Sequence, residues 1–243
     1  MKTINYPPDS LIKLVGSPTL EAYLAMGNRY AKTLFEGLYS DNSKILDAGC
    51  GSGRIARHLA DHLDETAGGV YHGFDIVSAA IDWCNENISS VYNNFNFKHI
   101  DIKNDHFNPT GSIESLENVI LDDLNYKENY FDFIFAASLF THLQKEELES
   151  YLKQLYVIAK PGCKLYLTFF TCDSIETFES LIHPNDHEYF QASDVSYVAD
   201  KSNPTGLVIY KLNYLKAIFN HVGFKVLDIP DTCWQTGILL EKI

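Results

Sequence analysis

Three glycines at alternate positions follow a short apolar run near residue 45. Gly49, Gly51 and Gly53 come directly after this run, which carries a carboxylate at Asp47. Glycines in such a turn let the backbone bend tightly and approach a ligand closely. A dinucleotide-binding turn has the spacing GxGxxG, but Arg54 stands where its third glycine belongs. The spacing therefore disfavours a nicotinamide dinucleotide site, and Asp47 favours a ligand that carries positive charge.

Two more carboxylates stand where the next two predicted strands end. Asp75 closes an apolar run, and an acidic side chain there can accept both hydroxyls of a ribose. It can equally favour the N-terminus of the helix that follows. Asp101 can accept the exocyclic amine of an adenine, with Ile76 and Ile102 on the two faces of the ring. An ordinary loop carboxylate is the alternative for Asp101.

A fourth apolar run, 131–136, leads into a segment with chemically useful side chains. Ser138, Phe140 and His142 follow this run at alternate positions. His142 can act as a general base because the ordinary pKa of histidine lies near neutrality. The alternative is that His142 only caps or packs at the start of the next helix.

Strand and helix patterns alternate along the chain, and these elements must position the residues above. Apolar strands that alternate with helices predict a mostly parallel sheet covered on both faces, which is the doubly wound α/β class. The expected strands are 44–48, 70–75, 95–100, 131–136, 164–170, 224–229 and 237–242, and the expected helices are 19–39, 54–63, 78–88, 145–159 and 212–221.

Two long polar stretches, 102–129 and 171–210, interrupt the alternation. Both follow predicted strands, and long loops at the carboxyl ends of parallel strands are usually functional. The second stretch contains His183, His187 and Tyr189, which we expect to line a substrate pocket together with Phe140.

Composition limits the class of protein further. The 243 residues are 46% hydrophobic, which is enough for one large domain or two small ones. The net charge of 19 − 32 = −13 lacks the basic surface of a protein that grips nucleic acid. The five cysteines form no CxxC pair and match no zinc spacing, so we expect free thiols and no metal. Without an apolar signal or membrane segment, the expected location is the cytoplasm.

The joint pattern resembles the class I S-adenosylmethionine-dependent methyltransferases. The family's first motif is matched over 46–53, its ribose-binding acid by Asp75, and its adenine-contact acid by 101–102. Its motif after the fourth strand is matched over 131–143, and 155–163 looks like its helix-to-fifth-strand corner, with a cysteine in place of the second glycine. The combination also looks like a bacterial small-molecule subgroup with unassigned substrates.

This resemblance implies a fold and a cofactor. The fold is a Rossmann-like, seven-stranded, mostly parallel sheet with one antiparallel strand near the C-terminus, in a single domain of residues 1–243 whose residues 1–43 form a helical cap. The cofactor is S-adenosylmethionine, and S-adenosylhomocysteine is the product. Asp47 would orient its ammonium group, and Arg54 or Arg29 is a candidate for its carboxylate, although Arg54 can equally begin a helix and point to solvent. Further cofactor contacts are assigned to Gly49, Gly51, Gly53, Asp75, Ile76, Asp101, Ile102 and Ser138.

The expected reaction is methyl transfer to a small-molecule acceptor by in-line displacement. The preferred acceptor atom is a hydroxyl oxygen of a sugar-like or secondary metabolite. A nitrogen acceptor in a small molecule or macromolecule is the alternative, as is a non-catalytic protein that binds the cofactor. No nucleic-acid or membrane partner is expected, and a monomer and a homodimer both remain open.

Overall fold

The computed structural model describes residues 3–114, 117, 119–172, 189–229 and 235–243. Within it, the chain forms two compact units. Unit 1 consists of Met1–Asp101 and Tyr130–Phe135, and unit 2 of Ile102–Asn129 and Ala136–Ile243. The single-domain organisation stays a prediction, and each unit is described by itself below.

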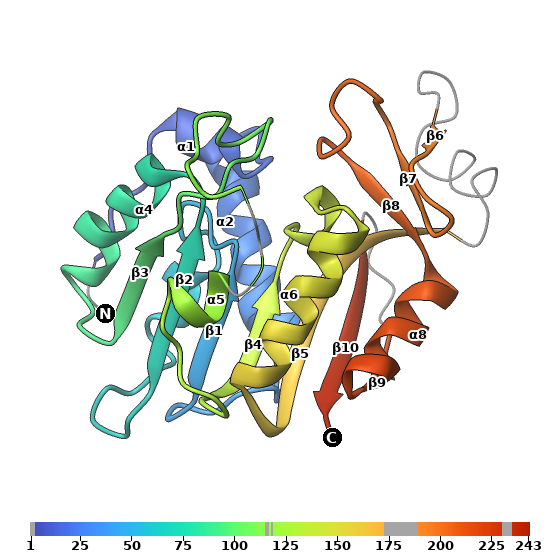
Figure 1. Cartoon of the computed structure of the whole chain (residues 1–243). Helices are drawn as coiled ribbons and strands as arrows, with labels where there is room; N and C mark the ends of the chain where they lie inside the picture. The colour runs from blue at the N-terminus through green and yellow to red at the C-terminus, as the bar shows by residue number, and fades with distance from the viewer. Residues whose placement is uncertain (1–2, 115–116, 118, 173–188, 230–234) are drawn as a thin grey trace. The chain divides into compact units, whose positions relative to one another are not determined.

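Unit 1 is built on a parallel sheet with the strand order β3-β2-β1-β4 (Figure 1). The strands are β1 (Lys44–Ala48), β2 (Val70–Asp75), β3 (Phe95–His99) and β4 (Phe131–Ala136). β1 and β4 are buried along almost their whole length, as expected for parallel strands that are covered on both faces. Since the strands run parallel, the carboxyl ends of β1 and β2 meet at one edge of the sheet, with Asp47 opposite Gly73.

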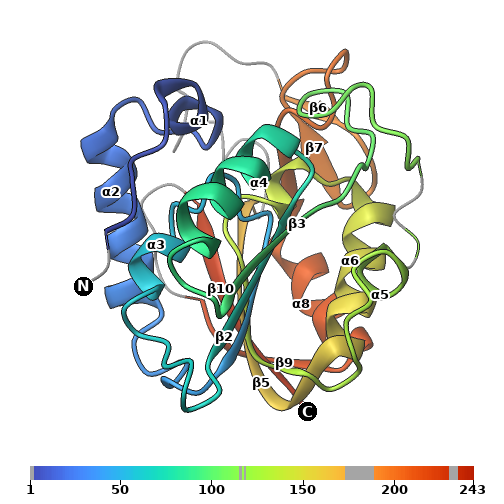
Figure 2. The same ribbon diagram turned by 90° about the vertical axis from the view of Figure 1, so that its left-hand side faces the viewer.

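The helices of unit 1 follow the predicted pattern, with one difference. α4 (Ser78–Cys84) and its π-helical continuation η2 (Asn85–Ser89) pack on β2 and β3 (Figure 2). The predicted helix 54–63 is reduced to four residues in α3 (Ala56–Leu59). Gly53 has a left-handed φ of 72°, so the chain continues in turns before the helix can start. The N-terminal segment contains α1 (Asp9–Leu14), α2 (Leu20–Arg29) and the π-helix η1 (Tyr30–Leu34).

Unit 2 contains the predicted antiparallel strand. β10 (Thr236–Lys242) pairs antiparallel with β5 (Ala159–Cys172) on one side and with β9 (Phe224–Asp228) on the other. β5 is longer than the predicted 164–170, partly because its last residues pair with a strand that the sequence did not predict. The α/β class, the mostly parallel main strands and the antiparallel strand near the C-terminus are confirmed. The predicted number of seven strands is wrong, because the described residues form ten.

The stretch 171–210 is not a plain loop where the structure describes it. β8 (Val208–Lys211) pairs parallel with the end of β5, and β7 (Ser196–Val198) and β6 (Phe190–Gln191) follow in antiparallel order. The turn of residues 199–207 joins β7 to β8. Among its described residues, the other insertion contains the short helix α5 (Val119–Asp122).

Two helices of unit 2 lie side by side near β5 and β9 (Figure 1). α6 (Lys145–Ile158) buries residues at helical spacing, including Leu148, Leu152 and Leu155. α8 (Leu212–Val222) ends at Gly223, whose left-handed φ of 111° terminates the helix.

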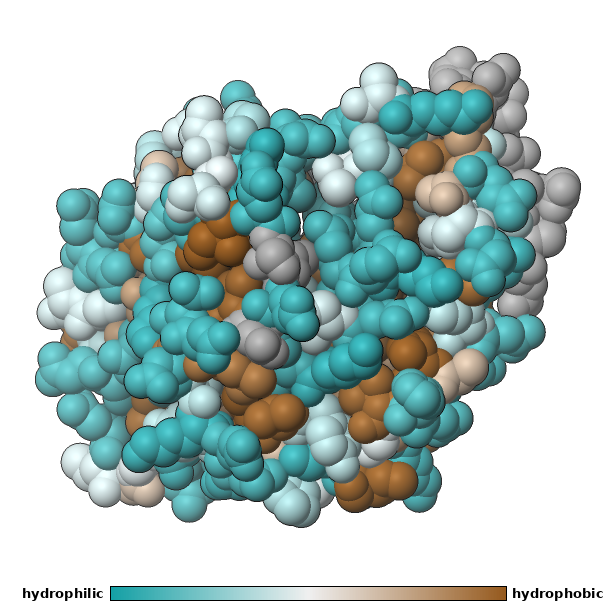
Figure 3. All heavy atoms as spheres, in the orientation of Figure 1, coloured by the Kyte–Doolittle hydropathy of each residue, from teal (hydrophilic) through white to brown (hydrophobic). Residues whose placement is uncertain are grey.

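Apolar side chains fill the interior of both units, and hydrophilic residues cover most of the face seen in Figure 3. The large apolar side chains that remain exposed among the described residues are Tyr6, Met26, Leu227 and Ile243. None of the helices in the described ranges combines the length and apolar character that crossing a membrane requires.

Candidate functional site

The glycine turn after β1 has a backbone that only glycine adopts easily. Gly49, Gly51 and Gly53 all have left-handed φ angles, of 78°, 52° and 72°. A Cβ added to Gly51 would lie 2.5 Å from Val15 Cγ1, and one added to Gly53 would lie 2.6 Å from Ile88 Cδ1. The turn therefore needs glycine for both its conformation and its packing, as the sequence spacing suggested.

Asp75, at the end of β2, holds the glycine turn through hydrogen bonds. Its Oδ2 accepts from the Gly51 N–H at 2.8 Å, and its Oδ1 accepts from the Val77 N–H at 2.9 Å. Burial raises the pKa of the Asp75 carboxyl, while these backbone donors oppose the shift. Each oxygen has a second lone pair, so the carboxylate can still accept both hydroxyls of a ribose. The contact with Val77 is also compatible with the alternative role near the N-terminus of α4.

Asp47 is a buried carboxylate beside the same turn. Asp47 is only 2% exposed, and its Oδ2 accepts a hydrogen bond of 2.5 Å from the Tyr71 hydroxyl. Burial raises the pKa of the Asp47 carboxyl to about 7, which means that ionisation without a cation is costly there. A nearby ammonium group would stabilise the ionised form, so the residues of this turn fit the expected cofactor.

Replacing Asp47 by asparagine is expected to stabilise the ligand-free protein at neutral pH. Because the folded pKa of about 7 lies above the ordinary 3.8, the wild type loses stability as pH rises from 3.8 to 7, and Asp47→Asn removes this loss. The variant should bind S-adenosylmethionine more weakly, since an amide cannot neutralise an ammonium group. Urea unfolding at pH 4 and pH 7.5, with calorimetric titration, measures both effects. If the free energy of unfolding of the wild type and of Asp47→Asn depends on pH in the same way, the raised pKa of Asp47 is contradicted.

The N-terminal segment is fastened to the glycine turn. The Tyr23 hydroxyl donates to the Ser52 carbonyl at 2.8 Å, and Ser52 Oγ donates to the Leu11 carbonyl at 3.2 Å. Arg54 Nη1 donates to the Val15 carbonyl at 2.8 Å and lies 3.2 Å from Ser17 Oγ. The expectation that Arg54 can point to solvent is therefore wrong, because its guanidinium ties the segment between α1 and α2 to the turn.

The remaining predicted adenine contacts are distributed over both units. In unit 1, Ile76 and Asp101 are half-buried. In unit 2, Ile102 is 5% exposed and forms a parallel bridge with Ile113. Their contacts with adenine stay predictions.

Ser138 in unit 2 has a strained backbone. Its φ is 68°, a left-handed value that costs a non-glycine residue about 1–3 kcal/mol. Its N–H donates to Thr168 Oγ1 at 2.7 Å, and Gln235 Nε2 donates to its Oγ at 3.0 Å. Strain held by such contacts is typical of functional sites, and this favours the predicted role of Ser138 in cofactor binding.

His142 lies in the 3-10 turn η3 (Phe140–His142), directly before α6, and it does not cap that helix. The cap is formed by Gln144, whose N–H donates to Glu147 Oε2 at 2.7 Å. His142 Nδ1 instead lies 2.9 Å from the Thr205 carbonyl oxygen. Burial lowers the pKa of the His142 imidazole, so this ring favours the neutral form.

The sequence did not identify the other residues around His142. The Phe107 ring meets the His142 ring edge-on at 4.9 Å between centroids, and the His106 ring lies parallel to it at 6.5 Å. Both residues come from the 102–129 stretch, and Thr205 comes from the 199–207 turn. The only sequence signal for these residues is the length of the stretches 102–129 and 171–210 and their place after predicted strands.

The predicted substrate-pocket residues have different surroundings. Phe140 is fully buried and stacks on Phe169, with 5.1 Å between ring centroids. Tyr189 is half-buried against a cluster that contains Phe170 and Ile209. His183 and His187 lie outside the described residues. Within the described ranges, no group of three or more His, Cys, Asp or Glu side chains is arranged to hold a metal ion.

Comparisons with known proteins place the chain in a family. Residues 23–229 match the family described as methyltransferase domain. The chain is 27% identical over 161 residues to phosphoethanolamine N-methyltransferase of Plasmodium falciparum; the match covers 65% of this chain and 52% of that protein, so the chain spans about half the length of this relative.

Solved structures show the same fold at low sequence identity. A SAM-dependent methyltransferase of Methanosarcina mazei matches with a TM-score of 0.55 and 19% identity, over 87% of this chain and 97% of that one. Magnesium protoporphyrin IX methyltransferase of Synechocystis PCC 6803, solved with bound SAH, matches with a TM-score of 0.59 and 15% identity, over 96% and 94%. The chain therefore belongs to the methyltransferase-domain family, and its fold is the one that these S-adenosylmethionine-dependent methyltransferases share.

Proposed function

We propose that this chain methylates a hydroxyl oxygen of a sugar-like or secondary metabolite. The observation that carries this proposal is the environment of His142. Its Nδ1 is 2.9 Å from a carbonyl oxygen and burial lowers its pKa, so a neutral imidazole is available as a proton acceptor. An alcohol needs such a base because its oxygen must lose a proton when the new bond forms.

The residues of unit 1 hold the cofactor in this proposal. Asp75 accepts the ribose hydroxyls while Gly51 and Val77 fix its two oxygens. Asp47 pairs with the ammonium group, and the Tyr71 hydroxyl fixes its Oδ2. When bound, S-adenosylmethionine supplies a methyl group on positively charged sulfur. The protein contributes alignment and exclusion of water rather than a covalent intermediate.

A nitrogen acceptor is the second candidate, and one observation favours it. The Plasmodium falciparum relative is named for N-methylation of phosphoethanolamine. A protonated amine must also lose a proton before it can attack, so His142 would serve this reaction in the same way.

Acceptor pairs that differ only in a hydroxyl or an amine separate the two candidates. The full chain is incubated with methyl-labelled S-adenosylmethionine and each pair, for example a sugar and its amino-sugar counterpart, together with phosphoethanolamine. We expect labelled product with the hydroxyl members. Label on the amines alone would establish the second candidate. Cofactor binding without transfer to any acceptor would favour the non-catalytic alternative.

Asp75→Ala is expected to weaken S-adenosylmethionine binding by about 1–3 kcal/mol, or roughly 5- to 150-fold, through loss of hydrogen bonds to the ribose. Calorimetric titration measures this change. Asp132→Ala is the matched control, because Asp132 Oδ2 also accepts a backbone N–H, from Lys44 at 2.8 Å at the start of β1. If both variants bind the cofactor like the wild type, Asp75 only supports the turn and α4.

A further inference from the structure

The turn of residues 199–207 supplies backbone hydrogen-bond partners of His142, from Thr205 and from Gly206. The Thr205 carbonyl oxygen lies 2.9 Å from His142 Nδ1. A carbonyl oxygen can only accept a hydrogen bond, so the imidazole proton must be on Nδ1. In the neutral ring, Nε2 then carries the lone pair.

The strand that follows this turn contacts the same segment a second time. The Tyr210 hydroxyl in β8 donates to the Leu143 carbonyl at 2.8 Å, in a buried contact directly after His142. Thr205 and Tyr210 therefore fix both the ring of His142 and the backbone beside it.

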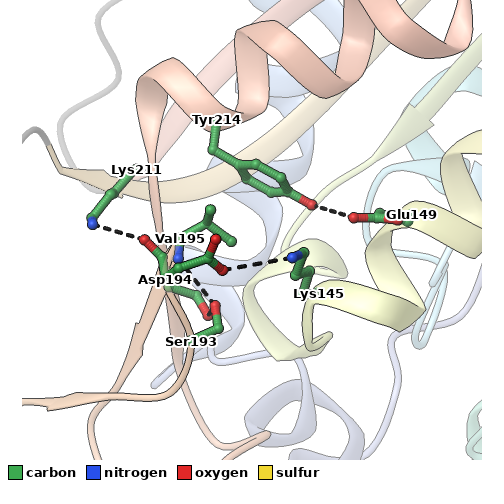
Figure 4. Close-up of polar contacts among 8 residues, drawn as sticks. Lys145, Glu149, Ser193, Asp194, Val195, Lys211 and Tyr214 are labelled. Carbon is green, nitrogen blue, oxygen red and sulfur yellow. Dashed lines mark hydrogen bonds and ion pairs between the residues drawn. The ribbon is translucent and has the colours of Figure 1, made fainter.

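The hairpin that carries the turn is anchored at its other end (Figure 4). Asp194, between β6 and β7, lies between two lysines: its Oδ1 is 3.6 Å from Lys145 Nζ in α6, and its carbonyl accepts from Lys211 Nζ at 2.8 Å. The Tyr214 hydroxyl in α8 donates to Glu149 Oε1 in α6 at 2.9 Å. These contacts join the hairpin and α8 to the helix that begins just after His142.

The turn itself is closed by its own hydrogen bonds. The Gly206 N–H donates to the Asn203 carbonyl at 3.0 Å, and the Ala199 N–H donates to the Leu207 carbonyl at 3.3 Å. Asn203 Nδ2 also lies 3.4 Å from His106 Nδ1. The ring of His106 is in turn parallel to the ring of His142. The position of the Thr205 carbonyl thus depends on the closed form of this turn.

We propose that the 199–207 turn positions the catalytic base, with the Thr205 carbonyl fixing the Nδ1–H tautomer of His142. The proton of the acceptor hydroxyl then passes to Nε2, and the acceptor oxygen keeps the electron pair. Thr205 is a positioning residue through its backbone. This inference rests on the proposed role of His142 as the base.

The tautomer can be observed without any methyl transfer. In the full chain labelled with ¹⁵N-histidine, the His142 signals, assigned by their loss in His142→Asn, should be those of a neutral ring with a proton on Nδ1. A neutral ring protonated on Nε2 would overturn the inference. Because this readout needs no acceptor, it stays separate from failure of the proposed function, which appears as a lack of transfer by the wild type.

Gly206→Pro tests the turn directly. Proline removes the Gly206 N–H and restricts the backbone of residue 205, which displaces the Thr205 carbonyl. We expect kcat to fall about 10- to 100-fold, within the contribution of a general base, with an unchanged Kd for S-adenosylmethionine and a mixed His142 tautomer. If this variant does not fold, Gly206→Ala replaces it, because its methyl group would lie 3.2 Å from the Asn203 carbonyl oxygen, the backbone acceptor that closes the turn.

Thr205→Val is the matched control. It keeps the carbonyl and changes only the side chain, whose Oγ1 is buried without a hydrogen-bond partner among the described residues. This variant should keep the Nδ1–H tautomer of His142. If Gly206→Pro shows the same single tautomer as Thr205→Val, the 199–207 turn does not position His142.

Discussion

His142→Ala is expected to lower kcat by about 10²–10⁴-fold, the usual contribution of a general base. The variant removes Nε2, which carries the lone pair when Nδ1 donates to the Thr205 carbonyl. The affinity for S-adenosylmethionine should stay near the wild-type value, because the residues assigned to the ribose and the ammonium group, Asp75 and Asp47, are unchanged. Initial rates with a saturating acceptor and calorimetric titration measure the two quantities.

The pH dependence of the same rate gives an independent test. Burial lowers the pKa of His142, so the ring loses its proton at a lower pH than an ordinary histidine. The wild-type kcat should therefore hold its plateau below pH 6.5, the ordinary histidine value, and fall only under more acidic conditions. His142→Ala should lose this acidic limb.

The control for His142→Ala is His221→Ala, which removes an exposed imidazole from the last turn of α8. It should keep the wild-type kcat and pH profile. A loss of only a few-fold in His142→Ala would make this residue part of the packing against Phe107, and a nitrogen or oxygen that needs no base would then be the acceptor.

The elements that the sequence predicted are those with strong local patterns. β2 and β4 begin and end at the predicted residues, because runs rich in aromatic and β-branched residues are bounded there by turns on both sides. The glycine turn was also predictable, since its three left-handed positions require glycine. Local chemistry alone fixes these features.

Contacts between distant segments could not be predicted in this way. Thr205 is 63 residues from His142, and nothing in either local pattern indicates that a carbonyl will meet the imidazole. The side chain of Arg54 likewise reaches back 39 residues to Val15, which no helical pattern encodes. The short strands β6, β7 and β8 depend on pairing with one another and with the end of β5, so the polar sequence of 171–210 by itself predicts only a loop.

Lys242→Met is expected to lower the free energy of unfolding by about 1–3 kcal/mol, because it leaves one buried and two partly buried acceptors without their donor. Lys242 is 8% exposed, and its Nζ donates to Asn129 Oδ1 at 3.0 Å, to the Tyr156 carbonyl at 2.8 Å and to the Ala159 carbonyl at 2.9 Å. The two carbonyls lie at the C-terminal end of α6, where the last carbonyls of a helix have no intrahelical partner. The amine of β10 thus caps the helix that begins beside His142.

Equilibrium urea unfolding of the wild type and of Lys242→Met measures this loss of stability. Lys225→Met is the matched control, because Lys225 is exposed on β9, the strand paired with β10, and its replacement should change stability by less than about 0.5 kcal/mol. Methionine preserves much of the apolar stem, so the difference between the variants reports the amine and its three acceptors. Equal stability of Lys242→Met and Lys225→Met would show that water replaces the amine at these carbonyls, and that β10 holds α6 through apolar packing alone.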